Sequence, residues 1–516
     1  MLQFLNVFLW NICRLKEVFP YRLDFFEQAE LFMDNKQLEE RLVTEKEEDD
    51  LKTRVWIESK TIWRIAFPSI LSRVTSFGMV VVTQSFLGHI GDVELASYAI
   101  IQTIIVRFMY GILIGMSSAT ETLCGQAFGA GHHHMMGIYL QRSWIVDGIT
   151  ATILVPLFIF ATPILRLLGQ EEELAVAAGP IALWFIPMIY SFVVSMTISM
   201  FLQAQLKNLI VGWLSTASFV VHIFLSWMFV NKFNWGMNGA MAAMTMSGWI
   251  MVVGQLVYVF GGWCPNTWRG FSKAAFFDLW PVVKLSISSG IMICLELWYF
   301  SILVLMAGYA KNATVAIDSF SICLNIYGWE FMVCLGFLVA ASVRVSNELG
   351  RGSAEAVKFA IKTILGTSTS IGVVLWILCM VFRNQIAYLF SDDEAVAETV
   401  SSLSGFFAFA ILINSVQPVL SGIATGAGLQ STVAYVNLGC YYAIGIPIGV
   451  LLGYVANLQV KGLWIGLMSG VVMQSVILGC FVWRTDWEEQ VRNASERLNR
   501  WLLKPAADDN ESLLDA

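Results

Sequence analysis

Twelve long apolar segments run through this chain of 516 residues, and they constrain its fold more than any other feature. A helix needs about 20 mainly apolar residues to cross the hydrocarbon core of a bilayer. The apolar runs are continuous rather than alternating, which favours membrane-spanning helices over a β-barrel. The predicted spans lie near residues 62–87, 96–118, 138–161, 175–200, 209–230, 237–260, 282–307, 314–340, 357–381, 399–424, 432–455 and 462–483.

The composition agrees with a multi-pass membrane protein. Hydrophobic residues make up 57% of the chain and charged residues only 13%, whereas soluble chains carry about 25% charged residues. A soluble fold of this size could not bury so many apolar side chains. The net charge of −7 does not suggest a nucleic-acid partner, and the nine scattered cysteines form no C-x-x-C pair, so we interpret them as reduced and buried.

Basic residues near the span ends predict the orientation of the chain in the membrane, because cytoplasmic loops carry an excess of lysine and arginine. With the N-terminus inside, the outer short loops hold few basic residues (Arg166, Lys232, Lys311, Arg383 and Lys461). The inner short loops hold more (Arg142, Lys207, Arg269, Lys273, Arg344, Arg351, Lys358 and Lys362). We therefore expect both tails in the cytosol.

The two halves of the sequence are related by a repeat. Residues Gly115 to Gly131 align without a gap with Gly336 to Gly352, at an offset of 221, and share four identical positions. Ile62-Trp63 with Leu279-Trp280, and Asn238-Gly239 with Lys461-Gly462, align in the same order at similar offsets. Because each copy holds six spans, both copies have the same orientation, which makes a parallel repeat typical of transporters.

This repeat predicts an all-α membrane protein of two six-helix lobes. The expected division is a cytosolic tail (1–55), a first lobe (56–262), a cytosolic linker (263–281), a second lobe (282–484) and a second cytosolic tail (485–516). Within the first tail we interpret residues 1–32 as a gene-model extension with Met33 as the natural start. A short apolar helix lying on the membrane surface is the alternative for this segment.

Ionisable residues inside the spans are candidates for function, because a charge at the bilayer centre costs at least a few kcal/mol. Glu296 lies near the middle of span seven, and the first half has no acid at the matching positions. Desolvation disfavours the ionised form of a carboxyl, so Glu296 is a candidate reversible proton carrier. The alternative is a protonated side chain bonded to a neighbouring helix. Asp318, near a span start, either shares the coupling or caps a helix end, and Glu330 lies in mid-span.

The sequence contains no catalytic or metal-binding motif. There is no P-loop, no H-E-x-x-H and no G-x-S-x-G, so we expect neither ATP-driven pumping nor an enzyme. The run His132-His133-His134 has no cysteine or acid at metal-ligand spacing, and we predict no metal site and no cofactor. A proton gradient is the expected source of energy.

Six segments give the chain a family resemblance. They are Leu123 to Ala130, Gly137 to Trp144, Phe201 to Gln205, Cys294 to Tyr299, Arg344 to Gly350 and Gln417 to Gly422. With them the chain resembles the multidrug and toxic compound extrusion (MATE) transporters, in particular the plant DETOXIFICATION branch, over roughly residues 52–490. The resemblance implies a V-shaped pair of lobes around a central cavity, and exchange of protons for organic compounds such as flavonoids, alkaloids, hormones or xenobiotics.

The resemblance also implies roles for individual residues. The span-seven glutamate of the family falls on Glu296. Some plant members have a second acid in span ten, where this chain has Asn414, which cannot titrate. Glu296 would then act alone or with Asp318. Further residues are assigned to the substrate cavity, namely Asn414, Gln417, Tyr299 and Glu330.

The resulting hypothesis is a monomeric, proton-coupled antiporter that exports organic solutes or sequesters them in the vacuole. Its membrane would be the vacuolar or the plasma membrane, and its partners are protons, a small organic solute and the lipid bilayer. The alternative is an anion channel or facilitator on the same scaffold. A multispan membrane enzyme is a third interpretation, which no catalytic motif supports.

Overall fold

The computed structural model describes residues 51–277, 279–307, 313–382, 408–456 and 458–501, together with residues 385 and 405. This part of the chain consists of helices and contains no β-strand. The α-helices are α3 (Leu51–Ile90), α4 (Asp92–Ile101), α5 (Arg107–Gly129), α6 (His133–Ile159), α7 (Ala161–Leu167), α8 (Glu172–Ala204), α9 (Leu209–Trp227), α10 (Gly236–Tyr258), α11 (Trp280–Ala307), α12 (Ala313–Arg351), α13 (Ala354–Val381), α16 (Gln417–Ala427), α17 (Gln430–Asn437), α18 (Ile446–Val450), α19 (Gln459–Arg484) and α20 (Trp487–Trp501).

Twelve helical segments among the described residues are long and apolar enough to cross a membrane, one for each span that the sequence predicts. Several spans are composite. The second runs from α4 through a π-helical segment into α5, and the eleventh runs from α17 through α18. The tenth span, Ala408–Ala427, ends in α16. The all-α membrane fold expected from the apolar pattern is therefore confirmed.

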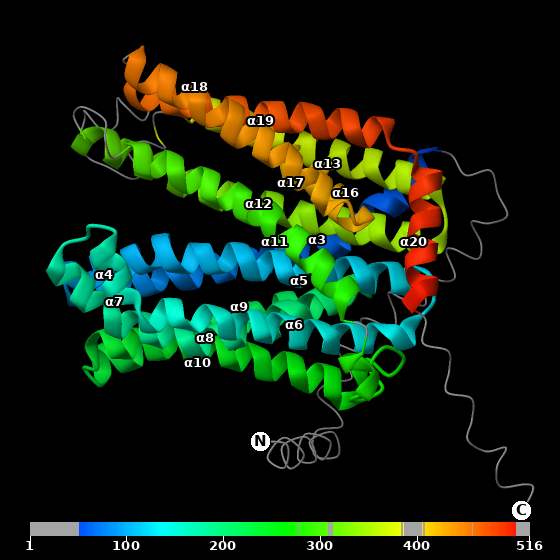
Figure 1. Ribbon diagram of the computed structural model, residues 1–516, viewed down its shortest axis with the longest axis horizontal. Helices are drawn as coiled ribbons and strands as arrows, with labels where there is room; N and C mark the ends of the chain where they lie inside the picture. The colour runs from blue at the N-terminus through cyan, green and yellow to red at the C-terminus, as the bar shows by residue number, and fades with distance from the viewer. Residues whose placement is uncertain are drawn as a thin grey trace, which may run out of the picture.

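The helices form two layers, which are the two lobes. Helices α3 to α10 make one layer and α11 to α19 the other, as their separate colour ranges show in Figure 1. The layers converge at the end of the molecule where α3 begins and α20 lies, which we name the tail end (Figure 1). They spread apart toward the opposite end, which carries α4, α7 and α18 and which we name the far end.

The lobes are held together by α3 and α5 of the first lobe, which pack against α11 and α12 of the second. Ile62 and Ile65 of α3 are fully buried in the same apolar cluster as Phe337 of α12 and Val419 of α16. Because lipid tails are as apolar as these side chains, close van der Waals packing rather than removal from water stabilises the contact. The first helix of one lobe therefore contributes directly to the core of the other.

The two repeat motifs meet at the tail end. Gly129 of α5 lies against the backbone carbonyl of Asn347, and Gly350 of α12 lies against the backbone carbonyl of Gln126. A Cβ atom at either glycine would overlap that carbonyl oxygen. Because Gln126 and Asn347 are counterparts in the repeat, as are Gly129 and Gly350, the two contacts are one contact made twice across a pseudo-twofold axis.

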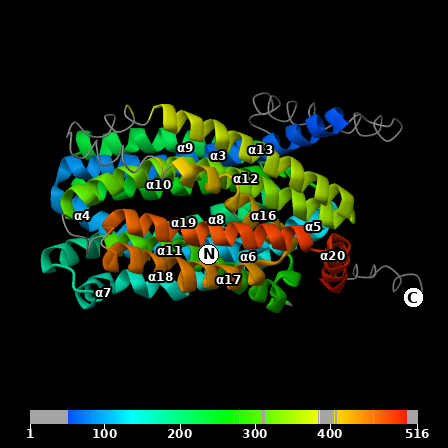
Figure 2. The same cartoon turned by 90° about the horizontal axis from the view of Figure 1, so that it is seen from above.

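Helix α20 closes the tail end from outside (Figures 1 and 2). Its Trp487 and Ala494 are buried in the core of the second lobe, whereas its Leu498 is buried in a cluster of the first lobe. Arg497 Nη1 donates a hydrogen bond to Gln126 Oε1 at 3.1 Å. A single amphipathic helix thus contacts both lobes where they converge.

Helix α20 lies within residues 485–516, where the sequence prediction has only a cytosolic tail. Its apolar positions recur at steps of three and four, which is the pattern of an amphipathic helix. Residues 1–50 lie outside the described part of the chain. The interpretation of residues 1–32 as an extension, with Met33 as the start, stays a prediction.

The glycine contact at the tail end generates a first prediction. We expect Gly129→Ala to lower the free energy of unfolding by about 1–3 kcal/mol, because an added methyl group in a packed contact forces the lobes apart. Gly148→Ala on α6 is the matched control, since a Cβ there meets nothing within 4 Å. Thermal unfolding of both purified variants measures the difference. Equal melting temperatures would contradict the close contact.

Candidate functional site

The tenth span is broken in its middle. Its helix runs to Asn414, Ser415 and Val416 form a turn, and α16 then begins at Gln417. Pro418 stands in the first turn of α16, where its missing N–H group leaves no helical hydrogen bond unmade. The break places two amide side chains on either side of the turn, in the interior of the second lobe.

Each of these amides holds one mid-membrane carboxyl. Gln417 Nε2 donates to Glu296 Oε1 of α11 at 3.0 Å, and Asn414 Nδ2 donates to Glu330 Oε2 of α12 at 3.0 Å. Glu330 is buried, and its Oε1 accepts a hydrogen bond from Cys334 Sγ at 2.9 Å. Glu296 is half-buried. The structure thus connects four of the predicted site residues in two pairs around one helix break.

The chemistry of an amide suits a carboxyl that gains and loses a proton. An amide NH₂ group donates to an ionised carboxylate, and after a rotation its carbonyl oxygen accepts from a protonated carboxyl. Neither state leaves the buried carboxyl without a partner, which would cost about 1–3 kcal/mol. The Glu296–Gln417 pair can therefore stay hydrogen-bonded in both protonation states.

Two other predicted residues lie elsewhere. Tyr299 is fully buried, its hydroxyl donates to the carbonyl oxygens of Gly466 and Leu467 at 3.0 and 3.1 Å, and its ring stacks on Tyr441 at 4.4 Å between centroids. In this conformation Tyr299 fastens α11 to α19 and does not face an open cavity. Asp318 belongs to α12, but its side chain lies outside the described part of the structure.

The structure also reveals buried acids that the sequence analysis did not assign to the site. Glu121 of α5 is buried, and its polar neighbours are Arg73 of α3 and Ser342 of α12, which is its own counterpart in the repeat. Asp147 of α6 is fully buried and accepts a hydrogen bond from Ser117 at 2.7 Å. The position of Glu121 inside the repeat motif was the available signal, since the second copy has no acid there.

An ion pair between the lobes was also missed. Arg344 of α12 donates from Nε and Nη2 to the two carboxylate oxygens of Glu58 on α3, at 2.8 and 2.9 Å. Arg344 also contacts Glu348 at 2.8 Å, and only 4% of its side chain is exposed. Bidentate pairing of an arginine with a carboxylate fixes geometry as well as energy. This pair lies near the glycine contacts and joins the two lobes at the tail end.

The fold and the site together define a membrane transporter of two six-helix lobes. The MatE family model matches residues 68–228 and 289–451, two stretches whose starts and ends are 221 and 223 residues apart, as in the repeat. The chain belongs to the MATE family of transporters, and it is accordingly a transporter and not an enzyme.

Known relatives agree over nearly the whole chain. Protein DETOXIFICATION 24 and Protein DETOXIFICATION 21 of Arabidopsis thaliana are 52% and 54% identical to it. These alignments cover 93% and 90% of this chain and 98% and 94% of the relatives. The crystal structure of the eukaryotic MATE transporter AtDTX14 matches with a TM-score of 0.82 at 32% identity, covering 86% of this chain and 99% of that chain.

The Glu296–Gln417 contact can be tested with a double-mutant cycle. Gln417→Leu should lower the free energy of unfolding by about 1–3 kcal/mol, because it removes the donor to Glu296. Adding Glu296→Leu should recover part of that loss, since both polar groups are then gone. The free energies of unfolding of wild type, both single variants and the double variant measure the coupling. Effects that add within about 0.5 kcal/mol would show that the two side chains are independent.

The ion pair at the tail end generates a separate prediction. Glu58→Gln should raise hydrogen exchange in the last turns of α12 roughly tenfold, a change of about 1.4 kcal/mol in local opening, because Arg344 loses its bidentate partner. Glu172→Gln is the matched control, because it breaks an exposed pair with Arg166 within the first lobe. Hydrogen-exchange mass spectrometry of both variants compares the same peptides. Unchanged exchange in Glu58→Gln would mean that the pair does not hold the lobes closed.

Proposed function

We propose that this MATE transporter is a proton-coupled antiporter of organic solutes, with Glu296 as its proton-binding group. The observation that carries the proposal is the half-buried carboxyl of Glu296 at 3.0 Å from Gln417, beside the break in the tenth span. A titratable group inside the membrane, bonded to a helix that is already interrupted, couples a proton to a part of the fold that can move.

The coupling follows from differential affinity. A proton shifts the balance between two conformations only if Glu296 binds it with different free energy in each. A tenfold difference in proton affinity corresponds to about 1.4 kcal/mol. Movement of α16 relative to α11 would change the distance from Gln417 to Glu296 and so change the stability of the ionised form. Asp318 stays the proposed second proton site.

The closed tail end indicates toward which side of the membrane this conformation of the transporter is open. With both tails in the cytosol, the conformation of this structure is closed toward the cytosol by the Glu58–Arg344 pair and α20, and its lobes spread toward the other side. We propose that the lobes at residues 56–262 and 282–484 rock about the tail end, linked by residues 263–281.

The chain would work as a monomer in the vacuolar or the plasma membrane.

The proposed cargo is an organic solute such as a flavonoid, an alkaloid or a xenobiotic. Support comes from the family and from the amides of Asn414 and Gln417, which offer both donors and acceptors to a polar organic molecule. Glu330 would add a carboxyl for a basic group. The polar groups of such a site set orientation, whereas apolar contact supplies most of the affinity.

Transport in proteoliposomes tests the proposal. Uptake of a fluorescent organic cation and of a flavonoid glycoside should follow an imposed proton gradient in wild type. Glu296→Gln should reduce that uptake to the level of empty vesicles, because the amide keeps the shape and cannot titrate. Glu296→Asp, which keeps a titratable group, should retain part of the gradient dependence.

Two outcomes would redirect the assignment. Gradient-dependent uptake that survives in Glu296→Gln moves the coupling to another acid, with Asp318 and Glu330 next. Uptake or current that ignores the proton gradient in every variant overturns the antiporter and favours an anion channel or facilitator.

A further inference from the structure

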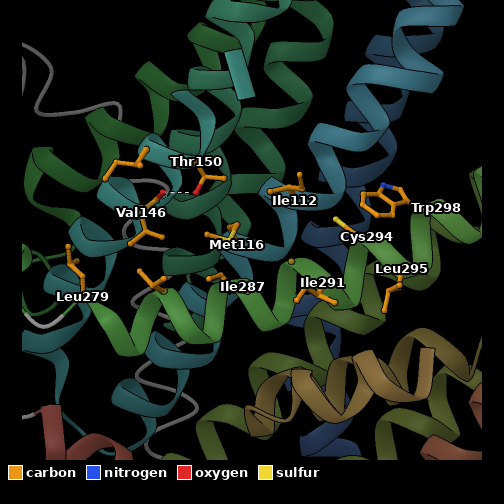
Figure 3. Close-up of a pocket in the computed structure, with 13 residues that line it drawn as sticks. Ile112, Met116, Val146, Thr150, Leu279, Ile287, Ile291, Cys294, Leu295 and Trp298 are labelled. Atoms are coloured by element: carbon orange, nitrogen blue, oxygen red, sulfur yellow. Dashed lines mark hydrogen bonds between the residues drawn. The ribbon is translucent and has the colours of Figure 1, made fainter. Parts of the chain in front are cut away.

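A groove of about 520 Å³ lies along the seam between the two lobes (Figure 3). Ile112 and Met116 of α5 and Val146 of α6 form the wall contributed by the first lobe, and α11 forms the wall contributed by the second. The lining is apolar apart from Thr150, whose hydroxyl donates to the Val146 carbonyl at 2.9 Å (dashed in Figure 3). The groove therefore offers hydrocarbon contacts and almost no polar ones.

The groove is separate from the proposed proton site. Ile287, Ile291, Cys294 and Trp298 recur along α11 at steps of three and four, so they lie on one face of the helix. Glu296 points to the opposite face, where it meets Gln417. The two sites share a helix but occupy its two sides.

The groove faces the surrounding bilayer. Ile149 and Ile291, one on each lobe, are 57% and 51% exposed although both lie within membrane spans. Apolar side chains exposed in this part of a membrane protein contact lipid tails. From Leu279 to Trp298 the groove follows α11 for about 28 Å at 1.5 Å per residue. That length is ample for one acyl chain, since the whole hydrocarbon core is about 30 Å thick.

The linker between the lobes, residues 263–281, lies at the end of this groove that is nearer the tail end. Its Ser272 N–H donates to Gln141 Oε1 at 2.9 Å, and its Ala274 carbonyl accepts from Arg142 at 3.3 Å. These two α6 residues lie about one turn from Val146 of the groove wall. These two hydrogen bonds to α6 hold the linker beside the end of the groove.

The same segment has the composition of a membrane interface that attracts anions. Exposed aromatic side chains gather in it, namely Phe271, Phe276, Phe277 and Trp280. Residues 269–284 contain three basic residues and one acid, and Arg269, Lys273 and Lys284 are exposed. Aromatic residues anchor at the headgroup level, and each basic residue there favours anionic lipids roughly fivefold.

We propose that the groove binds one acyl chain of an anionic phospholipid, with the headgroup beside Lys273 and Lys284. Because the walls belong to different lobes, rocking of the lobes changes the shape of the groove. The lipid therefore stabilises the conformation in which α6 and α11 stand as they do here, in proportion to its affinity difference between conformations. The inference depends neither on the transported solute nor on proton coupling.

Titration with defined lipids tests the proposal. The purified full chain in detergent is titrated with phosphatidylglycerol or with phosphatidylcholine, and native mass spectrometry counts the bound molecules. Wild type should bind one phosphatidylglycerol in preference to phosphatidylcholine. Ile291→Trp should weaken this binding because it fills the groove, and Lys273→Gln with Lys284→Gln should weaken it roughly thirtyfold because it removes two headgroup contacts.

Matched controls separate the groove from the rest of the lipid-facing surface. Ile377→Trp makes the same substitution at an exposed apolar position of α13, and Lys232→Gln removes an exposed lysine at the other end of the spans. Both should bind phosphatidylglycerol like wild type. Equal affinity of wild type for the two lipids, or wild-type affinity in both groove variants, would overturn the proposal. The double lysine variant lies on the surface, so it tests the site even if Ile291→Trp fails to fold.

Discussion

The close approach of α5 and α12 at the tail end is the contact on which the rest of the structure depends. Only glycine at 129 and 350 lets each backbone reach the carbonyl group of the partner motif. Once these helices touch, Glu58 can reach Arg344, and α20 can cover both lobes at once. Glu330 lies 17 residues along α12 from Asn347, about 25 Å at 1.5 Å per residue. A small rotation about the tail end therefore becomes a larger displacement at the mid-membrane carboxyls.

The interior of the second lobe shows how a membrane fold keeps acids without unpaired charge. Glu296 and Glu330 come from neighbouring spans, and a third span supplies both of their amide partners by breaking at Ser415. An unbroken helix would carry positions 414 and 417 on nearly the same face, one turn apart. The turn frees the two side chains to serve different helices. Pro418 favours the break in the helix, and the two carboxyl–amide pairs also require it.

The number and the positions of the spans could be predicted from the sequence, because the length of an apolar run is a local property. The repeat could be predicted because the two halves can be compared with each other at a fixed offset. Glu296 was recognisable because its apolar neighbours and acid-free counterpart stand in the sequence. Its partner Gln417 came from family resemblance, and the Glu58–Arg344 pair was not found, since 286 residues separate partners that only packing brings together. Tyr299 belongs to the same motif as Glu296 and was assigned to the substrate cavity by resemblance. In the structure its hydroxyl instead bonds α11 to α19.

The asymmetry between the lobes separates their roles. The first lobe carries the buried acids Glu121 and Asp147, the second carries Glu296 and Glu330, and the repeat does not superimpose these positions. In the second lobe each acid is hydrogen-bonded across helices to an amide beside a break, whereas the neighbours of Glu121 are Ser342 of α12 and the cationic Arg73 of α3. The tail-end contact therefore follows the symmetry of the repeat, whereas the ionisable groups in the lobe interiors do not. The repeat therefore constrains the packing between the lobes, where both copies must fit each other, more than it constrains the polar groups inside each lobe, where each copy packs only against itself.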